Sequence, residues 1–535
     1  MGRDTVALLL LFLDGSAASL LQSRCQLPRL TRLRAAPLVC CQSGARSHVS
    51  IDAVEVGSPP LPKYPPPPSY RECLAFVLNA VGIYAAPNLM SLIDAAFIGR
   101  VSTTELAALG PASAIADSAP SLVLFISIAA TNMVAKAHSS GNAEGTARVA
   151  GTSIALGGAG GVLLSVALLC GAQPISRLYC GSAATVLAPL CTQYVTIRAL
   201  ALPAVVFASV AQAICIGLKD TRTPMVAVAA AAGLNFCADL VLVNGLQMGI
   251  AGAAWATALS QLCAAGLLAR VLMGRGLLRL PTQRWSPLRS LRQPRRRRLT
   301  SSARWQTLGG IFSFIPFLFV MMIKIGMHNA CAAAAAALGG AAAAAHTALM
   351  AVAWVCFNLG DTGSSLCQAY IPVFTAPMEP RPQASTELSL DLDAAWPTIL
   401  QLLKCTLTIG VAVVCLSTSL LTLLAPQLTP DPAVRLHMRR VLPLMIATLS
   451  THGTAVTLEG LLLARKDFRG LALTYVGVAL SVALLLTLVQ ASGSGLMGVW
   501  GVYVWYCAAR ALAFAGFGGL LRFSRQSPRT QGVGS

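Results

Sequence analysis

The sequence predicts an all-α polytopic membrane protein, with twelve transmembrane helices in two lobes of six. Of the 535 residues, 56% are hydrophobic and only 11% are charged, whereas a soluble protein carries about 25% charged residues. Several apolar runs reach the ~20 residues that an α-helix needs to cross a bilayer. A transmembrane β-barrel would instead show short segments of alternating hydrophobicity.

The first 72 residues differ from the remainder, and we expect a transit peptide followed by a linker. Arginine and small residues are frequent there and acids are few, a composition typical of organelle transit peptides. The apolar run 6–13 is too short to span a bilayer, and a signal-peptide core is the alternative interpretation. The proline-rich stretch 59–68 predicts an extended linker.

Twelve apolar runs predict the transmembrane spans. In the N-terminal lobe, residues 73–272, they lie near 74–99, 111–136, 148–170, 192–215, 223–244 and 249–272. In the C-terminal lobe, residues 306–521, they lie near 306–329, 341–372, 397–425, 437–464, 468–490 and 496–521. The loop 273–305 is rich in arginine and lacks acids, so it stays outside the membrane and links the lobes. Residues 522–535 form a tail.

The two lobes share short motifs at corresponding positions. The sixth span opens with MGIAG at 248–252, and the twelfth with MGVWG at 497–501. The fourth and tenth spans both end in a Lys-Asp pair, Lys219-Asp220 and Lys466-Asp467. This agreement indicates a duplicated six-helix unit, a common plan for transporters.

Charge in the loops predicts the orientation. The N-terminus, the even-numbered loops and the C-terminus share the more basic side, which carries Lys136, Arg148, Lys219, Arg222, the Arg-rich linker, Lys466, Arg469, Arg522 and Arg525. The other side carries Arg100, Arg177, Arg435, Arg439 and Arg440. Both termini are therefore expected to face the cytosol or, in a plastid, the stroma. The net charge of +20 fits this rule, and no nucleic-acid-binding motif accompanies it.

Four acidic residues within or at the edge of apolar spans are the main functional candidates: Asp94, Asp239, Asp361 and Glu459. An ionised carboxylate in hydrocarbon costs at least ~2.5 kcal/mol, so such residues are rare and usually face an interior cavity. Several of them in one chain favour a carrier of protons, ions or charged solutes.

Asn235 and Asp239 are four residues apart and so lie on one helical face. If they converge with Asp94 and with Thr257 of the sixth span, the four side chains form an oxygen-rich pocket. Such a pocket binds Na⁺, or holds a carboxyl group that takes up a proton. A structural polar network between helices is the alternative interpretation.

Several segments resemble, in order, motifs of the multidrug and toxic compound extrusion (MATE) family. They are SLIDAAFIGRVSTTELAALGP at 91–111, NMVA at 132–135, IRALALPAVVFASVAQ at 197–212, GIAGAAWATALSQ at 249–261 and LEGLLLARKDF at 458–468. The resemblance covers roughly residues 72–525. It is strongest to the plant plastid-envelope branch, which includes an exporter of the salicylic acid pathway. It implies the MATE fold, with two lobes around a central cavity that alternate between inward-open and outward-open states.

The resemblance also implies cation-driven antiport and the residues that bind the cation. In the family's prokaryotic members that have an Asp in the first helix, the cation site of the N-terminal lobe uses that Asp, an Asn and an Asp four apart, and a Thr eighteen residues later. Asp94, Asn235, Asp239 and Thr257 fit this spacing. No cofactor is implied, and H⁺ is expected as the coupling ion, with Na⁺ as the alternative.

The C-terminal lobe offers four further candidates for substrate contact or coupling. Asp361 lies where the plant branch often has Glu, and Glu459 matches a Glu of that branch; a structural role is the alternative for each. His346 matches the family's Ala-His dipeptide, although a lone His is more often a helix contact. Lys324, in the seventh span, either extends to an interface or pairs with an anion or carboxylate. We hypothesise that Lys324 favours anionic substrates.

The predicted function is secondary antiport of small organic solutes, organic anions or xenobiotics, in exchange for protons or Na⁺. Lipid-linked flipping by a related two-lobe fold is the alternative. No enzyme is expected, because the sequence lacks an HExxH motif and a GxxxxGK[ST] loop. The expected partners are the lipid bilayer and a small organic substrate, without nucleic acid, and a monomer is expected. The expected location is the chloroplast envelope, with the plasma or vacuolar membrane as alternatives.

Overall fold

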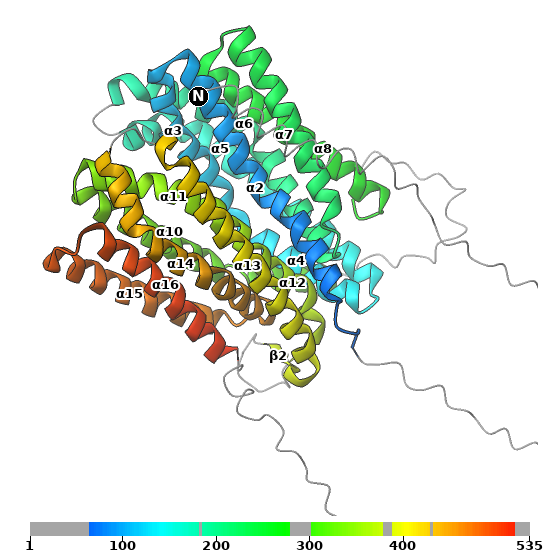
Figure 1. Cartoon of the computed structure of the whole chain (residues 1–535). Helices are drawn as coiled ribbons and strands as arrows, with labels where there is room; N and C mark the ends of the chain where they lie inside the picture. The colour runs from blue at the N-terminus through cyan, green and yellow to red at the C-terminus, as the bar shows by residue number, and fades with distance from the viewer. Residues whose placement is uncertain (1–63, 181–183, 279–300, 378–387, 429–431, 519–535) are drawn as a thin grey trace, which may run out of the picture. The chain divides into compact units, whose positions relative to one another are not determined.

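The structure, a computed structural model, describes residues 64–180, 184–278, 301–377, 388–428 and 432–518 (Figure 1). The predicted transit peptide, most of the Arg-rich linker and the tail 522–535 lie outside the described residues. Apart from one short strand pair, the described chain is helical, as the sequence predicted.

Helices of the N-terminal half reproduce the first six predicted spans. They are α2 (Tyr70–Val101), α3 (Thr103–Ser118), η1 (Ala119–Val123), α4 (Leu124–Ser139), α5 (Ala143–Cys180), α6 (Ala184–Gly217), α7 (Arg222–Asp239), the π-helical turn η3 (Leu240–Gly245) and α8 (Gly249–Gly274). The second span is broken at η1, because Pro120 has no backbone N–H to donate.

The C-terminal half supplies the other six. Its elements are α9 (Ser301–Phe312), α10 (Pro316–Ala337), α11 (Gly340–Gly360), α12 (Thr362–Tyr370), η5 (Pro372–Phe374), β1 (Thr375–Pro377), β2 (Leu388–Leu390), α13 (Leu392–Leu428), α14 (Pro432–Arg465), α15 (Phe468–Ser492) and α16 (Gly495–Phe517). Strands β1 and β2 pair antiparallel, with Ala376 opposite Ser389. The seventh span breaks between α9 and α10, and the eighth breaks at Asp361.

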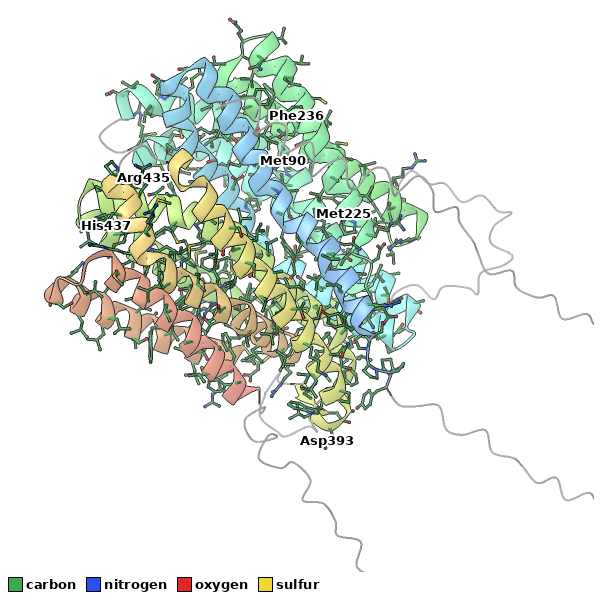
Figure 2. The ribbon with its side chains drawn as sticks, viewed as in Figure 1. Met90, Met225, Phe236, Asp393, Arg435 and His437 are labelled. Atoms are coloured by element: carbon green, nitrogen blue, oxygen red, sulfur yellow. The ribbon has the colours of Figure 1, made fainter. Side chains whose placement is uncertain are left out.

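Ten helical segments in the described part of the chain are long and apolar enough to cross a membrane by composition alone. Helix α2 and the pair α11–α12 are not among these ten. They occupy the positions of the first and eighth predicted spans and complete twelve. Within the N-terminal half, α2 packs on α7 where Gly82 meets Met225 (Figure 2).

The two Lys-Asp pairs form the same local turn. Lys219 and Lys466 both have left-handed backbone, with φ of 63° and 61°. The Asp220 carboxylate accepts from the Thr223 N–H at 3.0 Å, and Asp467 accepts from the Gly470 N–H at 2.8 Å. Each Asp therefore satisfies a free donor at the start of the next helix.

Hydrogen bonds join the two halves at the middle of α2 and along the second half of α4. The Tyr84 hydroxyl lies 2.5 Å from the Ser365 hydroxyl, and Asn132 Nδ2 donates to Gln368 Oε1 at 3.1 Å. Lys136 Nζ donates to the Thr375 carbonyl at 2.8 Å. Helix α12 and the segment after it thus contact α2 and α4 on the side that the charge pattern predicts to carry the termini.

A carboxylate from α3 caps the start of α8. Glu105 Oε2 accepts from the Ile250 N–H at 2.6 Å. Gly249, the residue before, has φ of +56°, and a Cβ there would overlap the Glu105 carboxylate. The glycine is needed for both backbone conformation and space.

Gly249→Ala is expected to lower the free energy of unfolding by about 1–3 kcal/mol, because it strains the left-handed backbone and displaces Glu105. The matched control is Gly266→Ala in the same helix, where a Cβ meets nothing within 4 Å. Thermal unfolding of the purified protein in detergent measures both. Equal melting temperatures for the two variants would contradict the assignment.

Candidate functional site

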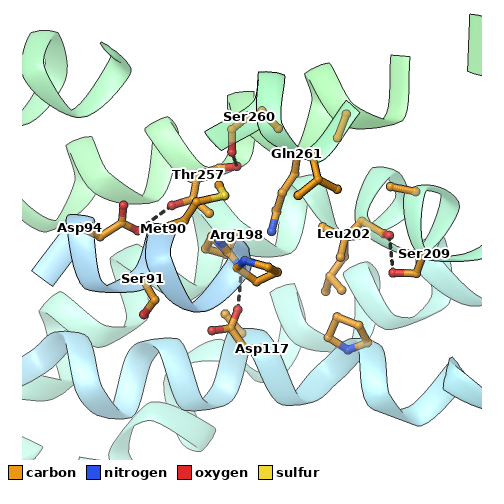
Figure 3. A pocket seen from close by; sticks show the side chains of 18 of the residues that line it. Met90, Ser91, Asp94, Asp117, Arg198, Leu202, Ser209, Thr257, Ser260 and Gln261 are labelled. Carbon is orange, nitrogen blue, oxygen red and sulfur yellow. Dashed lines mark hydrogen bonds and ion pairs between the residues drawn. The ribbon is translucent and has the colours of Figure 1, made fainter. Parts of the chain in front are cut away.

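The four residues predicted to form a cation site converge inside the N-terminal half. Asp94 lies in α2, Asn235 and Asp239 lie in α7, and Thr257 lies in α8. Thr257 Oγ1 donates to Asp94 Oδ2 at 2.8 Å (Figure 3), and Asn235 Nδ2 donates to Asp94 Oδ1 at 3.3 Å. All four side chains are buried. The structure therefore brings together the four residues that the spacing selected.

Asp239 is the member of this cluster that lacks partners. Both of its carboxylate oxygens, and Oδ1 of Asn235, are buried without a hydrogen-bond partner among the described residues. Asp239 is also close enough to Asp94 for the two charges to interact. Two buried neighbouring carboxylates do not both ionise without a compensating cation. The arrangement therefore fits a bound proton or a monovalent cation.

The local sequence explains how the carboxylates approach each other. Helix α7 buries Ala227, Ala231 and Ala238, and small residues let membrane helices pack closely. Asp239 ends α7, and the chain then forms the π-helical turn 240–245. Such turns often occur at functional sites because they reorient the adjoining side chains.

A cavity of about 410 Å³ adjoins the cluster, entirely within the N-terminal half (Figure 3). Helices α2, α3, α6, α7 and α8 line it. Its walls combine the apolar side chains of Met90 and Leu202 with the polar side chains of Thr257, Ser260 and Gln261. The volume and the mixed lining are typical of a small-molecule site.

An ion pair that the sequence analysis did not single out borders the cavity. Arg198 of α6 donates from Nη2 to Asp117 Oδ1 of α3 at 2.7 Å (Figure 3). The Arg198 side chain is 7% exposed, whereas that of Asp117 is 57% exposed. Arg198 lies within an apolar span, so the criterion that identified the four carboxylates would have found it.

The C-terminal half contains a second charged cluster, around Glu459 of α14. Lys324 Nζ of α10 lies 3.2 Å from Glu459 Oε1. Tyr475 of α15 donates its hydroxyl to Glu459 Oε2 at 2.8 Å. Arg510 of α16 lies 3.7 Å from the same oxygen, and its guanidinium is 3.9 Å from the centre of the Tyr506 ring. Of the two alternatives for Lys324, the structure therefore shows pairing with a carboxylate.

Arg510 was also missed by the sequence analysis, although it is a fully buried cation in the last span. It donates to the Tyr475 hydroxyl at 3.1 Å and so connects α16 to α15. A charge within an apolar segment was again the available signal. Its partner was not predictable, because Glu459 is 51 residues away in sequence and on another helix.

Asp361 and His346 make no hydrogen bond to Glu459 in the described structure. Asp361 lies at the break between α11 and α12, half-buried, and its charge interacts with that of Lys324. His346 stacks on Tyr503, with ring centres 6.2 Å apart, and meets Trp500 edge-on at 5.9 Å. These rings favour the packing interpretation of His346.

Glu459→Gln is expected to destabilise the protein by about 3–5 kcal/mol, because it leaves buried cations without their counter-charge. Lys324→Met should cost less, since Arg510 and Tyr475 still contact Glu459. Glu459→Gln should also cost less in the Lys324→Met background, with a coupling energy of about 0.5–3 kcal/mol. Chemical denaturation measures the stability of the two single variants and the double variant. Glu144→Gln is the control, because Glu144 is exposed. Additive effects would show that Lys324 and Glu459 are not energetically coupled.

The chain is similar in sequence to a family model and to two plant proteins. The MatE family model matches residues 80–241. The chain is 29% identical over 457 residues to the Arabidopsis thaliana "Protein DETOXIFICATION 47, chloroplastic", covering 81% of this chain and 75% of that protein. It is 30% identical over 200 residues to "Protein DETOXIFICATION 44, chloroplastic" of the same plant, covering 36% and 38%.

The fold is also that of solved proteins. A crystal structure of a MATE transporter from Vibrio cholerae aligns with a TM-score of 0.70 and 17% identity, covering 85% of this chain and 97% of that one. At this identity the likeness concerns the fold alone. The predicted all-α architecture of two six-helix lobes is the one that these proteins share.

Proposed function

We propose that the chain is a multi-pass membrane antiporter of small organic solutes in the multidrug and toxic compound extrusion family, and that its coupling cation binds at Asp94, Asn235, Asp239 and Thr257. The observation that carries this proposal is the pair of buried, unpartnered oxygens of Asp239 next to Asp94. The comparisons do not support lipid-linked flipping. The chloroplast envelope is the proposed location, as in the relatives named chloroplastic.

Coupling follows from the different hydrogen bonds of the two protonation states. An ionised carboxylate only accepts hydrogen bonds, whereas a protonated one also donates. A proton on Asp239 or Asp94 therefore supplies a donor for the orphan Asn235 Oδ1, or for the other carboxylate. The surrounding helices then pack differently in the two states. Proton uptake and solute release favour opposite states of the lobes, which is coupling through differential affinity.

We propose that the solute occupies the cavity of the N-terminal half. Asp117 and one ionised carboxylate of the Asp94–Asp239 pair outnumber Arg198, so the cavity attracts cations. A cationic or polar solute therefore competes directly with the proton. In the C-terminal half, Lys324 and Arg510 are balanced by Glu459 and Asp361. This balance leaves Lys324 little free charge for an anionic substrate.

Asp239→Asn is expected to slow gradient-driven efflux from proteoliposomes by about ten-fold or more, because an amide cannot take up and release a proton. Asp393→Asn is the control, since Asp393 is exposed in the first turn of α13 (Figure 2). The assay follows a panel of organic cations and anions, driven by a pH gradient without Na⁺ and by a Na⁺ gradient without a pH gradient.

The outcomes separate the alternatives. Efflux driven only by the pH gradient identifies H⁺ as the coupling ion. Efflux driven only by the Na⁺ gradient identifies Na⁺. If Asp239→Asn transports as well as the wild type, coupling does not reside in the N-terminal cluster. The corresponding variants of Asp361 and Glu459 would then be tested.

A further inference from the structure

A pair of lysines from opposite lobes lies at the seam where the lobes meet. Lys136 is in the last turn of α4, and its Nζ donates to the Thr375 carbonyl at 2.8 Å and to Thr375 Oγ1 at 3.2 Å. Lys466 is in the turn between α14 and α15, and its Nζ donates to Ser313 Oγ at 3.1 Å and to the Gly310 carbonyl at 3.5 Å. Both side chains are half-buried.

Direct packing of α9 on α4 brings these two lysines together. A Cβ on Gly310 of α9 would lie 2.7 Å from the end of the Met133 side chain, one turn before Lys136. The Lys466 ammonium donates a hydrogen bond to the carbonyl of the same Gly310. It lies 5.0 Å from the centre of the Phe314 ring. The left-handed backbone of Lys466 fixes the turn that presents this side chain.

Neither lysine has an anionic partner among the residues that the structure describes. The ion pairs within 4.0 Å in the described chain are Arg198–Asp117, Arg275–Asp220, Lys324–Glu459 and Arg510–Glu459. The nearest acid in sequence, Asp467, instead accepts from the Gly470 N–H. Burial, together with the charge of Lys136, lowers the pKa of Lys466 to about 8. Two like charges, partly removed from water and without a counter-charge, are unfavourable in the protein alone.

The corresponding turn of the N-terminal half does not share this arrangement. Lys219 lies 4.3 Å from the centre of the Tyr370 ring and interacts with the charge of Glu72. Its positive charge is therefore partly offset by Glu72. The uncompensated pair is specific to Lys136 and Lys466.

We propose that Lys136 and Lys466 bind a phosphate-type oxyanion that bridges the two lobes. An ammonium has three N–H donors, and the bonds described above use two on each lysine, so each keeps one for the ligand. A tetrahedral oxyanion offers several acceptors and the negative charge that the pair lacks. Its source is either free phosphate or the phosphate of an anionic lipid headgroup at this edge of the membrane.

Such a ligand would hold the lobes together on one side of the membrane. Lys136 belongs to the N-terminal half and Lys466 to the C-terminal half, so an anion that contacts both binds only while this side is closed. It therefore stabilises that state and opposes the alternation on which export depends. The site is separate from the Asp94–Asp239 cluster, and its test needs no transport assay.

The test is thermal unfolding of the full chain in two arms. One arm titrates inorganic phosphate into protein in neutral detergent, against chloride at equal ionic strength. The other compares nanodiscs of phosphatidylcholine with nanodiscs that contain phosphatidylglycerol. The variants are Lys136→Gln and Lys466→Gln, with Lys136→Arg to retain the charge and the exposed Lys404→Gln as matched control.

Inorganic phosphate or phosphatidylglycerol is expected to raise the melting temperature of the wild type, Lys404→Gln and Lys136→Arg. The arm in which the melting temperature rises identifies the source of the phosphate. Each Gln variant should bind the anion about ten-fold or more weakly, because it loses one charge-assisted hydrogen bond. Absence of stabilisation of the wild type in both arms would overturn the proposal, whether or not the variants fold. An equal response of the wild type and the Gln variants would overturn it as well.

Discussion

The need to compensate every charge inside the bilayer is the constraint on which this structure depends. Three cations within the spans meet it with carboxylate partners: Arg198 with Asp117, and Lys324 and Arg510 with Glu459. Asp94 meets it with hydrogen bonds from Asn235 and Thr257. Asp239 does not meet it within the described chain, since both of its oxygens lack a partner. A group that the fold buries without compensation requires something from outside, and for a carboxylate that is a cation.

The same constraint is visible in the helices. A continuous α-helix satisfies its own backbone, so an interruption within a span must have a local cause. The π-helical turn follows Asp239 directly, and the break of the eighth span falls at Asp361. The break between α9 and α10 presents the Gly310 carbonyl and the Ser313 hydroxyl to Lys466. Irregular backbone thus occurs beside charged side chains, where polar groups have partners other than lipid.

How much the sequence could predict follows from this physics. Hydropathy located twelve spans, because crossing a bilayer needs a minimum apolar length. Family spacing and helical periodicity brought Asp94, Asn235, Asp239 and Thr257 together correctly. Periodicity specifies the face of a helix but not the neighbour of that face, so the pairing of Lys324 with Glu459, 135 residues apart, was not predictable. The charges of Arg198 and Arg510 within apolar spans were signals of the same kind, because a buried cation costs as much as a buried carboxylate. The capping of α8 by Glu105 depends on a contact between helices that no local pattern encodes.

The two halves share a local design and differ in their use of charge. Both build the Lys-Asp turn with the same left-handed lysine and the same capping carboxylate. Within the described residues, the N-terminal half combines uncompensated carboxylate oxygens with a cavity of about 410 Å³. In the C-terminal half, two cations and two acids balance, and aromatic rings pack around His346.

A balanced, closed cluster resists protonation, because a proton on Glu459 would leave Lys324 and Arg510 without their partner. An unbalanced cluster beside a cavity accepts a proton readily. This difference supports our proposal that ion and solute are coupled in the N-terminal half, with a structural role for the charges of the C-terminal half.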